Sequence, residues 1–420
     1  MRVKLISSST GPIVLYGLIT GSLRMVVGAT SVVYLTAHGV SLAQIGAMKA
    51  MQALLILLLD VPLSYLADRT SRVYVLVGGN VATALWLGTT AYSTSVPGFF
   101  LAEAFNAIGL AAFNGVFTAV LIDSYEKEYG RQDFENVLGW FGKWQFFLMA
   151  VAAAGGAVFY MGASPIVWWT ASFGMILLTV LTPIFFAGHT VGAHNTFPLN
   201  DQGLNAGRAA RRSTHPLHFV QHGQASTLLQ AVRRNSRVLP LALALAGILL
   251  TFQVLLQFWQ PVVEGAMAMS YDPGKLFGAA FVIFLLAQSL ASQCVRRSAS
   301  VTHGWPMRTC FLACIAMMCW MYSDLSVAFV IAAIAMAFFV VKGLSIVVLS
   351  NIQRVVPREN WSMTESAISS FTRLLFIATL PFVGAFGDRA SAQGIFVVIL
   401  LFMAGSFLCL ALGSKRRPPY

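Results

Sequence analysis

Residues 42–72, LAQIGAMKAMQALLILLLDVPLSYLADRTSR, decide the fold. The run 42–66 is predominantly apolar and is longer than the about 20 residues that a helix needs to cross a bilayer. Only helices and closed barrels satisfy their backbone hydrogen bonds in lipid, and this run is too long and too evenly apolar for a barrel strand. The stretch therefore predicts a transmembrane helix that ends at the charged residues Asp68, Arg69 and Arg72.

The composition of the whole chain agrees with this interpretation. Of its 420 residues, 57% are hydrophobic and only 10% are charged, and the mean hydropathy is +0.75. Soluble domains are about 25% charged, and disordered chains are polar and poor in aromatic residues, so both classes are excluded. In a membrane protein, a net charge of +12 reflects topology rather than binding to nucleic acid. The lipid bilayer is the expected surrounding, and no nucleic-acid partner is expected.

Apolar runs separated by polar breaks recur along the chain. They predict an all-α membrane protein with twelve transmembrane helices. The predicted spans are residues 11–36, 42–66, 73–94, 97–123, 139–161, 165–188, 238–260, 275–295, 307–323, 325–351, 362–386 and 392–413.

The distribution of basic residues predicts the topology. With a cytoplasmic N-terminus, twenty of the 27 Lys and Arg residues fall in inner segments, and only Lys275 and Arg389 fall in outer loops. Because basic loops stay on the cytoplasmic side, both termini are predicted to be cytoplasmic. The expected location is the inner (plasma) membrane of a bacterium, crossed many times. The other five cations lie inside predicted spans: Arg24, Lys49, Lys143, Lys342 and Arg373.

One connection differs from the others. Residues 189–237 are polar and contain five of the seven His residues and six Arg residues. We interpret this segment as a cytoplasmic linker between an N-terminal half of six helices, 1–188, and a C-terminal half of six helices, 238–420. A metal site on one helical face of this linker is a second interpretation, with His215, His218 and His222 as ligands.

No cofactor is expected from the sequence. The five Cys residues have no paired spacing, which argues against disulfides and against a Cys-based metal site. The chain has no phosphate-binding Gly loop, nucleophile triad or metal-ligand cluster, so it is not expected to be an enzyme. We expect a monomer.

The segment Pro62-Leu-Ser-Tyr-Leu-Ala-Asp68-Arg69-Thr-Ser-Arg72 follows the second span. It resembles the G-x-x-x-D-R-x-G-R-[RK] signature of the major facilitator superfamily, with Ser64 and Ser71 at positions where that family usually has Gly and Val73 where it has a basic residue. The stretch Tyr34–Gly46 also looks like the first hairpin of that family. The resemblance implies twelve helices in two halves of six, and it covers nearly the whole chain.

The resemblance also implies a gating role for the charged motif. Asp68, Arg69 and Arg72 would form charged hydrogen bonds that hold the cytoplasmic side shut, and Asp123 at the inner end of the fourth span would complete the latch. The alternative is that these charges only mark the membrane edge. A similar segment, Pro381-Phe-Val-Gly384-Ala-Phe-Gly-Asp388-Arg389, follows the eleventh span on the predicted outer side. It is either an inverted-repeat counterpart or a helix end with a charged stop.

Two features of proton-coupled drug exporters are missing. Phe105 stands where many proton-coupled members have Arg in the fourth span, and the fifth span, near Gly155 and Gly156, lacks the Gly-Pro of the antiporter motif. These absences weaken a specific drug/proton antiporter assignment, but they do not affect the predicted fold.

Charges in the middle of predicted spans indicate a substrate site. An ionisable residue at mid-bilayer costs about 2.5–3.5 kcal/mol, so it usually faces a wet cavity or a partner. Arg24, Lys342 and Arg373 predict a site for an anionic group, because guanidinium pairs bidentately with oxyanions. The alternative is that Arg24 or Lys342 pairs internally with Glu103 or Asp60 and only pins helices together. Lys49 and Lys143, nearer to span ends, are expected to snorkel to the membrane surface. In the superfamily, spans 1, 4, 7 and 10 line the central path, which adds three polar candidates: Asn106, Gln253 and Gln257.

Glu103 in the fourth span is the candidate proton carrier. A partly buried carboxyl group can load and release a proton as a cavity changes sides. The alternative is a plain hydrogen-bonding role with the nearby Asn106 and Asn114.

Together these features predict a secondary active transporter that works by alternating access. It would move a small organic solute, anionic or amphiphilic, across the inner membrane, coupled to protons. Export is favoured because the first hairpin and the loop after the second span look like those of efflux members. The alternatives are proton-coupled uptake of an organic anion or a metal chelate such as a siderophore, and a non-transporting receptor or chaperone with the same fold.

Overall fold

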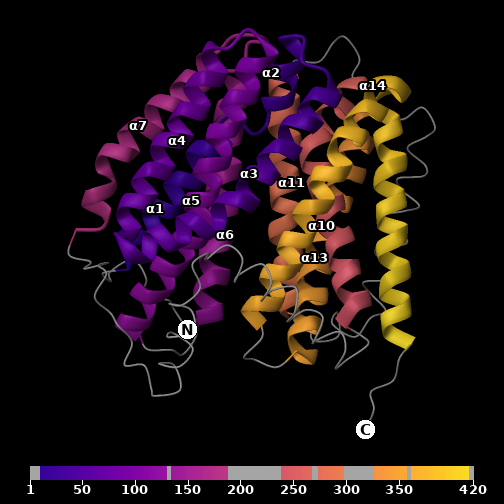
Figure 1. Cartoon of the computed structure of the whole chain (residues 1–420). Coiled ribbons are helices and arrows are strands. Elements are labelled where there is room, and N and C mark those ends of the chain that lie inside the picture. The colour runs from indigo at the N-terminus through magenta and orange to yellow at the C-terminus, as the bar shows by residue number, and fades with distance from the viewer. Residues whose placement is uncertain are drawn as a thin grey trace.

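The computed structural model describes residues 10–129, 134–187, 238–266, 273–297, 326–356 and 361–415, and this part of the chain is all-helical without strands. Figure 1 shows the helices standing side by side as a bundle. They are α1 (Gly11–Met25), α2 (Ser31–Ala37), α3 (Leu42–Arg69), α4 (Arg72–Tyr92), α5 (Val96–Tyr129), α6 (Phe134–Val158), α7 (Ile166–Phe185), α10 (Val238–Gly265), α11 (Pro273–Arg297), α13 (Val327–Val355) and α14 (Trp361–Lys415).

Within the described residues, nine helices contain a segment that is long and apolar enough to cross a membrane. This confirms a multi-pass, all-α membrane protein. The predicted span 307–323 and the linker 189–237 lie outside the described residues, so the count of twelve spans stays a prediction. The nine segments are Leu42–Ala67, Arg72–Tyr92, Val96–Tyr125, Trp140–Val158, Ile166–Phe185, Val238–Gly265, Gly274–Val295, Val327–Ile352 and Ala367–Arg389.

The first predicted span, 11–36, is not one continuous helix. α1 ends at Met25, and α2 begins only at Ser31 after a turn. Inside the turn, the N–H of Gly28 donates to the carbonyl of Met25 at 3.0 Å. Hydropathy could not reveal this break, because apolar residues continue through it.

The two last predicted spans, 362–386 and 392–413, are joined in one helical segment, α14. Figure 1 shows α14 rising through the bundle, turning at the top and descending as its yellow part. The intervening sequence Asp388-Arg-Ala-Ser-Ala-Gln contains no proline, so nothing in it forces the helical backbone to end.

The two ends of the bundle are distinguished by their contacts. At the end called proximal here, the hydroxyl of Thr10 donates to the carbonyl of Ser124 at 3.5 Å, close to the last turns of α5. At the opposite, distal end, the backbone N–H groups of Leu42 and Ala43, the first residues of α3, donate to the carboxylate of Asp388 at the turn of α14. α1 begins and α14 finishes towards the proximal end (Figure 1).

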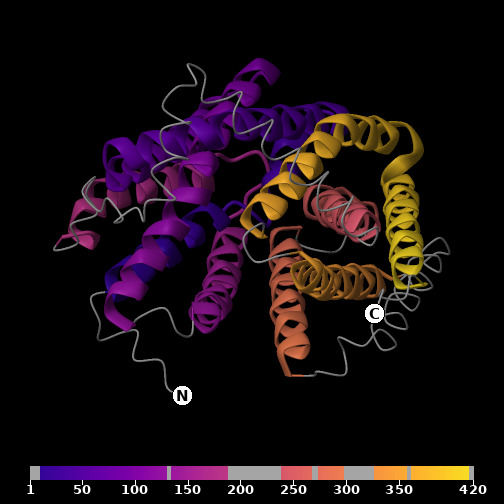
Figure 2. The same ribbon diagram turned by 60° about the horizontal axis from the view of Figure 1, so that its bottom comes forward.

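The helices before residue 188 and those after residue 237 occupy different sides of the bundle (Figures 1 and 2). α4 packs against α5 and α7, and α1 packs against α6; on the other side, α10 packs against α13 and α14. The two sides meet where α3 packs against α14, where α6 packs against α11, and where α2 touches α10. The division into halves at 189–237 stays a prediction, because that linker lies outside the described residues.

Glycines allow the closest of these contacts. A Cβ atom at Gly46 of α3 would lie 2.2 Å from the carbonyl oxygen of Leu380, and one at Gly384 of α14 would lie 2.1 Å from the carbonyl oxygen of Leu42. The backbones of α3 and α14 therefore touch near the distal end, in the way that small residues allow between membrane helices.

We predict that Gly46→Ala destabilises the protein by about 1–3 kcal/mol, the usual cost of overpacking, because backbone atoms of α14 would have to move. Thermal unfolding of the purified protein measures this. Gly78→Ala is the matched control, since a Cβ atom there meets nothing within 4 Å. Equal melting temperatures for the two variants would contradict the close crossing of α3 and α14.

Candidate functional site

Arg24 lies in the last turn of α1, directly before the break in the first span. Its Nη1 donates to the Thr83 hydroxyl at 2.8 Å, and its Nη2 donates to Oδ1 of Asn106. Its guanidinium also lies 5.0 Å from the centroid of the Trp86 ring. These direct partners are all uncharged, and the nearest carboxylate described, that of Glu103, reaches Arg24 only through Asn106.

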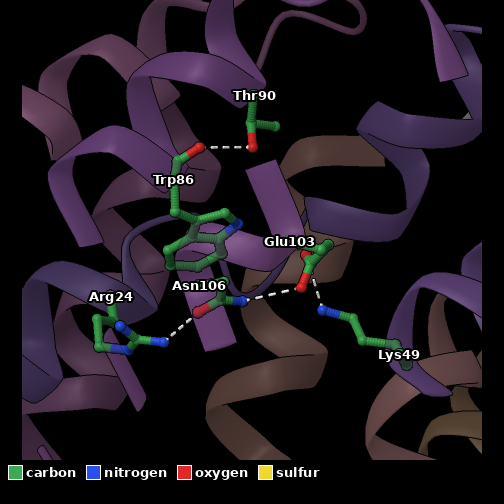
Figure 3. Close-up of polar contacts among 6 residues, drawn as sticks. All are labelled: Arg24, Lys49, Trp86, Thr90, Glu103 and Asn106. Atoms are coloured by element: carbon green, nitrogen blue, oxygen red, sulfur yellow. Dashed lines mark hydrogen bonds and ion pairs between the residues drawn. The ribbon is translucent and has the colours of Figure 1, made fainter. Parts of the chain in front are cut away.

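Asn106 connects Arg24 to a carboxylate (Figure 3). The Nδ2 of Asn106 donates to Oε2 of Glu103 at 3.0 Å, and the ammonium of Lys49 donates to Oε1 of Glu103 at 2.9 Å. Glu103 and Asn106 are three residues apart on α5, so they share one face of that helix. We call Arg24, Asn106, Glu103 and Lys49 the charged chain; it has two cations and one carboxylate.

The position of Lys49 differs from the expectation. It was predicted to snorkel to the membrane surface, but its side chain is only 15% exposed and points to Glu103, whose side chain is 8% exposed. Lys49 is on the second turn of α3, which packs against α5, so the carboxylate of Glu103 lies within reach of its ammonium. This pairing could not be predicted from sequence, because the two residues are on different helices.

Arg373 and Asp60 form a second ion pair, between α14 and α3. The Nη1 of Arg373 donates to Oδ2 of Asp60, while the other carboxylate oxygen of Asp60 is buried without a hydrogen-bond partner in the described part of the chain. Arg373 was predicted to bind substrate. In this conformation its charge is instead compensated by Asp60, across the contact between the two sides of the bundle.

Lys342 lies on α13 and is half-buried. Its ammonium is 5.7 Å from the centroid of the Phe146 ring on α6, which lies across the bundle. Among the described residues no carboxylate pairs with Lys342; the side chain of Glu365, another acid of the late spans, is not among them.

Gln253 and Gln257 lie on α10, where Gln253 is half-buried and Gln257 is buried. The next residue of that face, Gln260, makes three hydrogen bonds to the backbone around the break in the first span. Sequence reasoning assigned Gln260 no role.

The signature motif forms a contact inside the early helices. Nη1 of Arg72, at the start of α4, donates to the carboxylate of Asp123 on α5. Arg69 lies over the ring of Tyr65 on its own helix, at 4.7 Å from the centroid. Arg72 and Asp123, two members of the predicted latch, are therefore in contact, while the side chain of Asp68 lies outside the described part.

The described residues contain no group of three His, Cys, Asp or Glu side chains that could hold a metal ion. The linker residues His215, His218 and His222 lie outside them.

The described helices form a bundle with many segments able to span a membrane and with charged side chains between them. A family model of the major facilitator superfamily matches residues 13–360, and the chain belongs to this superfamily. It is therefore a transporter of the secondary type and not an enzyme.

Solved structures agree with this assignment. The nucleoside transporter NupG is similar with a TM-score of 0.74 and 14% sequence identity, covering 97% of this chain and 100% of that one. A POT family transporter in complex with 5-aminolevulinic acid has a TM-score of 0.67 at 14% identity, covering 97% and 96%. The peptide transporter POT in complex with sulfate has a TM-score of 0.70 at 11% identity, covering 97% and 94%. At such identities these similarities show the fold alone. No curated protein sequence matches the chain.

We predict that Lys49→Met destabilises the protein by about 3–5 kcal/mol, because it leaves the carboxylate of Glu103 buried without its cation. The double variant Lys49→Met/Glu103→Gln should recover most of this loss, since it removes both charges. Chemical or thermal unfolding of the purified protein provides the comparison, and Lys143→Met, at an exposed Lys, is the control. If the double variant is as unstable as the single variant, the loss of stability does not come from the unpaired carboxylate of Glu103.

Proposed function

We propose that this protein moves a small organic anion across the bacterial inner membrane by alternating access, coupled to protons. The observation that carries the proposal is the environment of Arg24, which is held by the uncharged side chains of Thr83 and Asn106 over the ring of Trp86. A guanidinium whose direct partners are all uncharged is suited to bind an oxyanion.

The charge balance supports an anion rather than a neutral solute. In the charged chain, the carboxylate of Glu103 compensates only one of the two cations, Arg24 and Lys49. Lys342 adds a further positive charge from the later helices. Removing charges from water is costly unless they are paired, so a substrate that supplies a negative charge would be stabilised between these cations.

The positions of the cations suit alternating access. Arg24 is on α1 and Lys342 is on α13, which belong to different sides of the bundle. An anion bound between them would contact both proposed halves at once. In this proposal Asn106, Gln253 and Gln257 supply polar contacts, and Arg373 joins the site only in a conformation that separates it from Asp60.

Aromatic rings accompany both cations. Trp86 lies beside Arg24, and Phe146 lies beside Lys342. A substrate between these residues would therefore meet apolar rings next to each positive charge, which favours an amphiphilic anion. Among the structural relatives, one transporter was solved in complex with 5-aminolevulinic acid and another with sulfate.

We propose Glu103 as the proton carrier. Its carboxylate is held by Lys49 and, through Asn106, is linked to Arg24. A proton on Glu103 would weaken its hold on Lys49 and leave the charged chain more positive. An anion and a proton would therefore favour each other's binding, as thermodynamic linkage requires of two coupled sites.

This linkage bears on the direction of transport. The resemblance to efflux members favours export, our first candidate for direction, but proton-driven export requires the proton and the anion to compete for the site, and the linkage described above argues against that. The Lys49–Glu103 pair favours a second candidate, uptake of the anion together with a proton, because the two ligands would bind cooperatively and not in competition. The sign of substrate-driven proton movement in proteoliposomes separates the two.

We predict that organic anions raise the melting temperature of the purified protein and that Arg24→Gln weakens their binding about 10- to 100-fold, the effect of losing a charged hydrogen bond. The measurement is a thermal-shift screen with organic anions, siderophores and drugs, followed by titration of each hit beside an uncharged analogue of the same size. Lys143→Gln, which removes an exposed cation, should bind like the native protein. Unchanged affinity in Arg24→Gln would refute the role of Arg24.

We further predict that Glu103→Gln abolishes substrate-driven proton movement in proteoliposomes, because the amide cannot carry a proton. A pH-sensitive dye inside the vesicles reports this movement, and tracer uptake of the same substrate reports whether binding and exchange persist. Proton movement equal to that of the native protein would show that another group carries the proton.

A further inference from the structure

At the distal end, two side chains from the later helices bind backbone groups of the first two spans. The first is Gln260 of α10, which is only 1% exposed. Its Oε1 accepts hydrogen bonds from the backbone N–H groups of Val32 at 2.8 Å and Val33 at 3.1 Å. Its Nε2 donates to the carbonyl of Gly28 at 3.0 Å.

The break in the first span explains why these bonds form. The first N–H groups of a helix have no partner within the helix, and Val32 and Val33 are the second and third residues of α2. Within a membrane, such groups must be satisfied by other parts of the protein. The amide of Gln260 matches the break, because its oxygen can accept two hydrogen bonds while its nitrogen donates.

The second side chain is Asp388, at the turn of α14. Its Oδ1 accepts from the N–H of Leu42 and its Oδ2 accepts from the N–H of Ala43, both at 2.9 Å. α3 does not need this contact to begin, because Ser41 and Gln44 already form a capping box at its N-terminus. The bonds of Asp388 can therefore be released without unwinding α3.

We propose that Gln260 and Asp388 together form the gate that closes the distal end and that both must release the early helices when this end opens. Both side chains come from after residue 237, and both bind backbone groups from before residue 188. The close crossing of α3 and α14, at Gly46 and Gly384, lies at the same end. Separating the two sides of the bundle there breaks all of these contacts.

The two contacts differ in how costly they are to break. Asp388 is exposed, so water can replace its hydrogen bonds when it releases Leu42 and Ala43. Gln260 is buried, so its release leaves backbone groups of the break without partners until water or a substrate reaches them. Gln260 therefore resists opening more strongly than Asp388 does. When the distal end opens, the backbone N–H and carbonyl groups at the break in the first span are exposed.

Hydrogen–deuterium exchange of the purified protein in lipid nanodiscs tests the proposal without a substrate. Gln260→Leu should speed amide exchange about tenfold at Val32 and Val33, whose N–H groups lose their acceptor. If the contacts form one gate, it should also speed exchange at Leu42 and Ala43, which Gln260 does not touch. Asp388→Ala should speed exchange at Leu42 and Ala43, where its own bonds are lost. If the contacts form one gate, it should also speed exchange at Val32 and Val33, which Asp388 does not touch.

Matched controls are available for both variants. Gln288→Leu removes another buried Gln, whose Nε2 donates, within the described residues, to the carbonyl of Phe284 on its own helix at 3.2 Å. Arg389→Ala changes the exposed neighbour of Asp388. Neither control should alter exchange at the distal end.

Two results would overturn the proposal. In one, each variant affects only the amides that it contacts, so the two contacts are independent. In the other, exchange rises equally at both ends of the bundle, so the side chains contribute only general stability. The proposal goes beyond the proposed function and does not rest on it: coupled exchange at the distal end would stand even if no anion were transported.

Discussion

A charge or an unpaired backbone group inside the membrane is costly without a partner, and this constraint organises the structure. Arg24 has Thr83 and Asn106, Glu103 has Lys49, and Arg373 has Asp60. The same constraint applies to the broken first span, whose backbone is completed by Gln260. Because these partners are on different helices, the helices are tied together at these points, and a conformational change must exchange one set of partners for another.

α3 carries the contacts through which such an exchange can pass. Near the distal end it receives Asp388 and touches α14 at Gly46. Further along, Lys49 joins it to Glu103, and Asp60 joins it to Arg373. The helix thus connects the distal gate, the charged chain and the second ion pair. A change of charge on Glu103 would act on the helix that also forms the gate.

Much of the fold could be predicted from sequence. The run 42–66 predicted α3, Leu42–Arg69, and the run 97–123 predicted α5, Val96–Tyr129, because hydropathy reports directly on burial in lipid. The motif ending at Arg72 predicted the superfamily, which the match over residues 13–360 confirmed.

The pairing of side chains could not be predicted in the same way. Sequence reasoning selected Arg24, Asn106 and Glu103, and the structure brings these three together. It missed that Lys49 completes the charged chain, and it did not choose Asp60 as the partner of Arg373. The contact between Gln260 and Val32 joins residues 228 positions apart. Such contacts depend on how helices pack, and helical periodicity within one segment carries no information about them.

The most direct test of the account is the number of protons exchanged when an anion binds. Titration calorimetry in buffers of different ionisation enthalpy measures this number. The account predicts that anion binding is accompanied by proton uptake in the native protein and that Glu103→Gln binds the anion without it. Proton release on binding, or equal binding of an uncharged analogue, would contradict the claim that an anion completes a positively charged, proton-linked site.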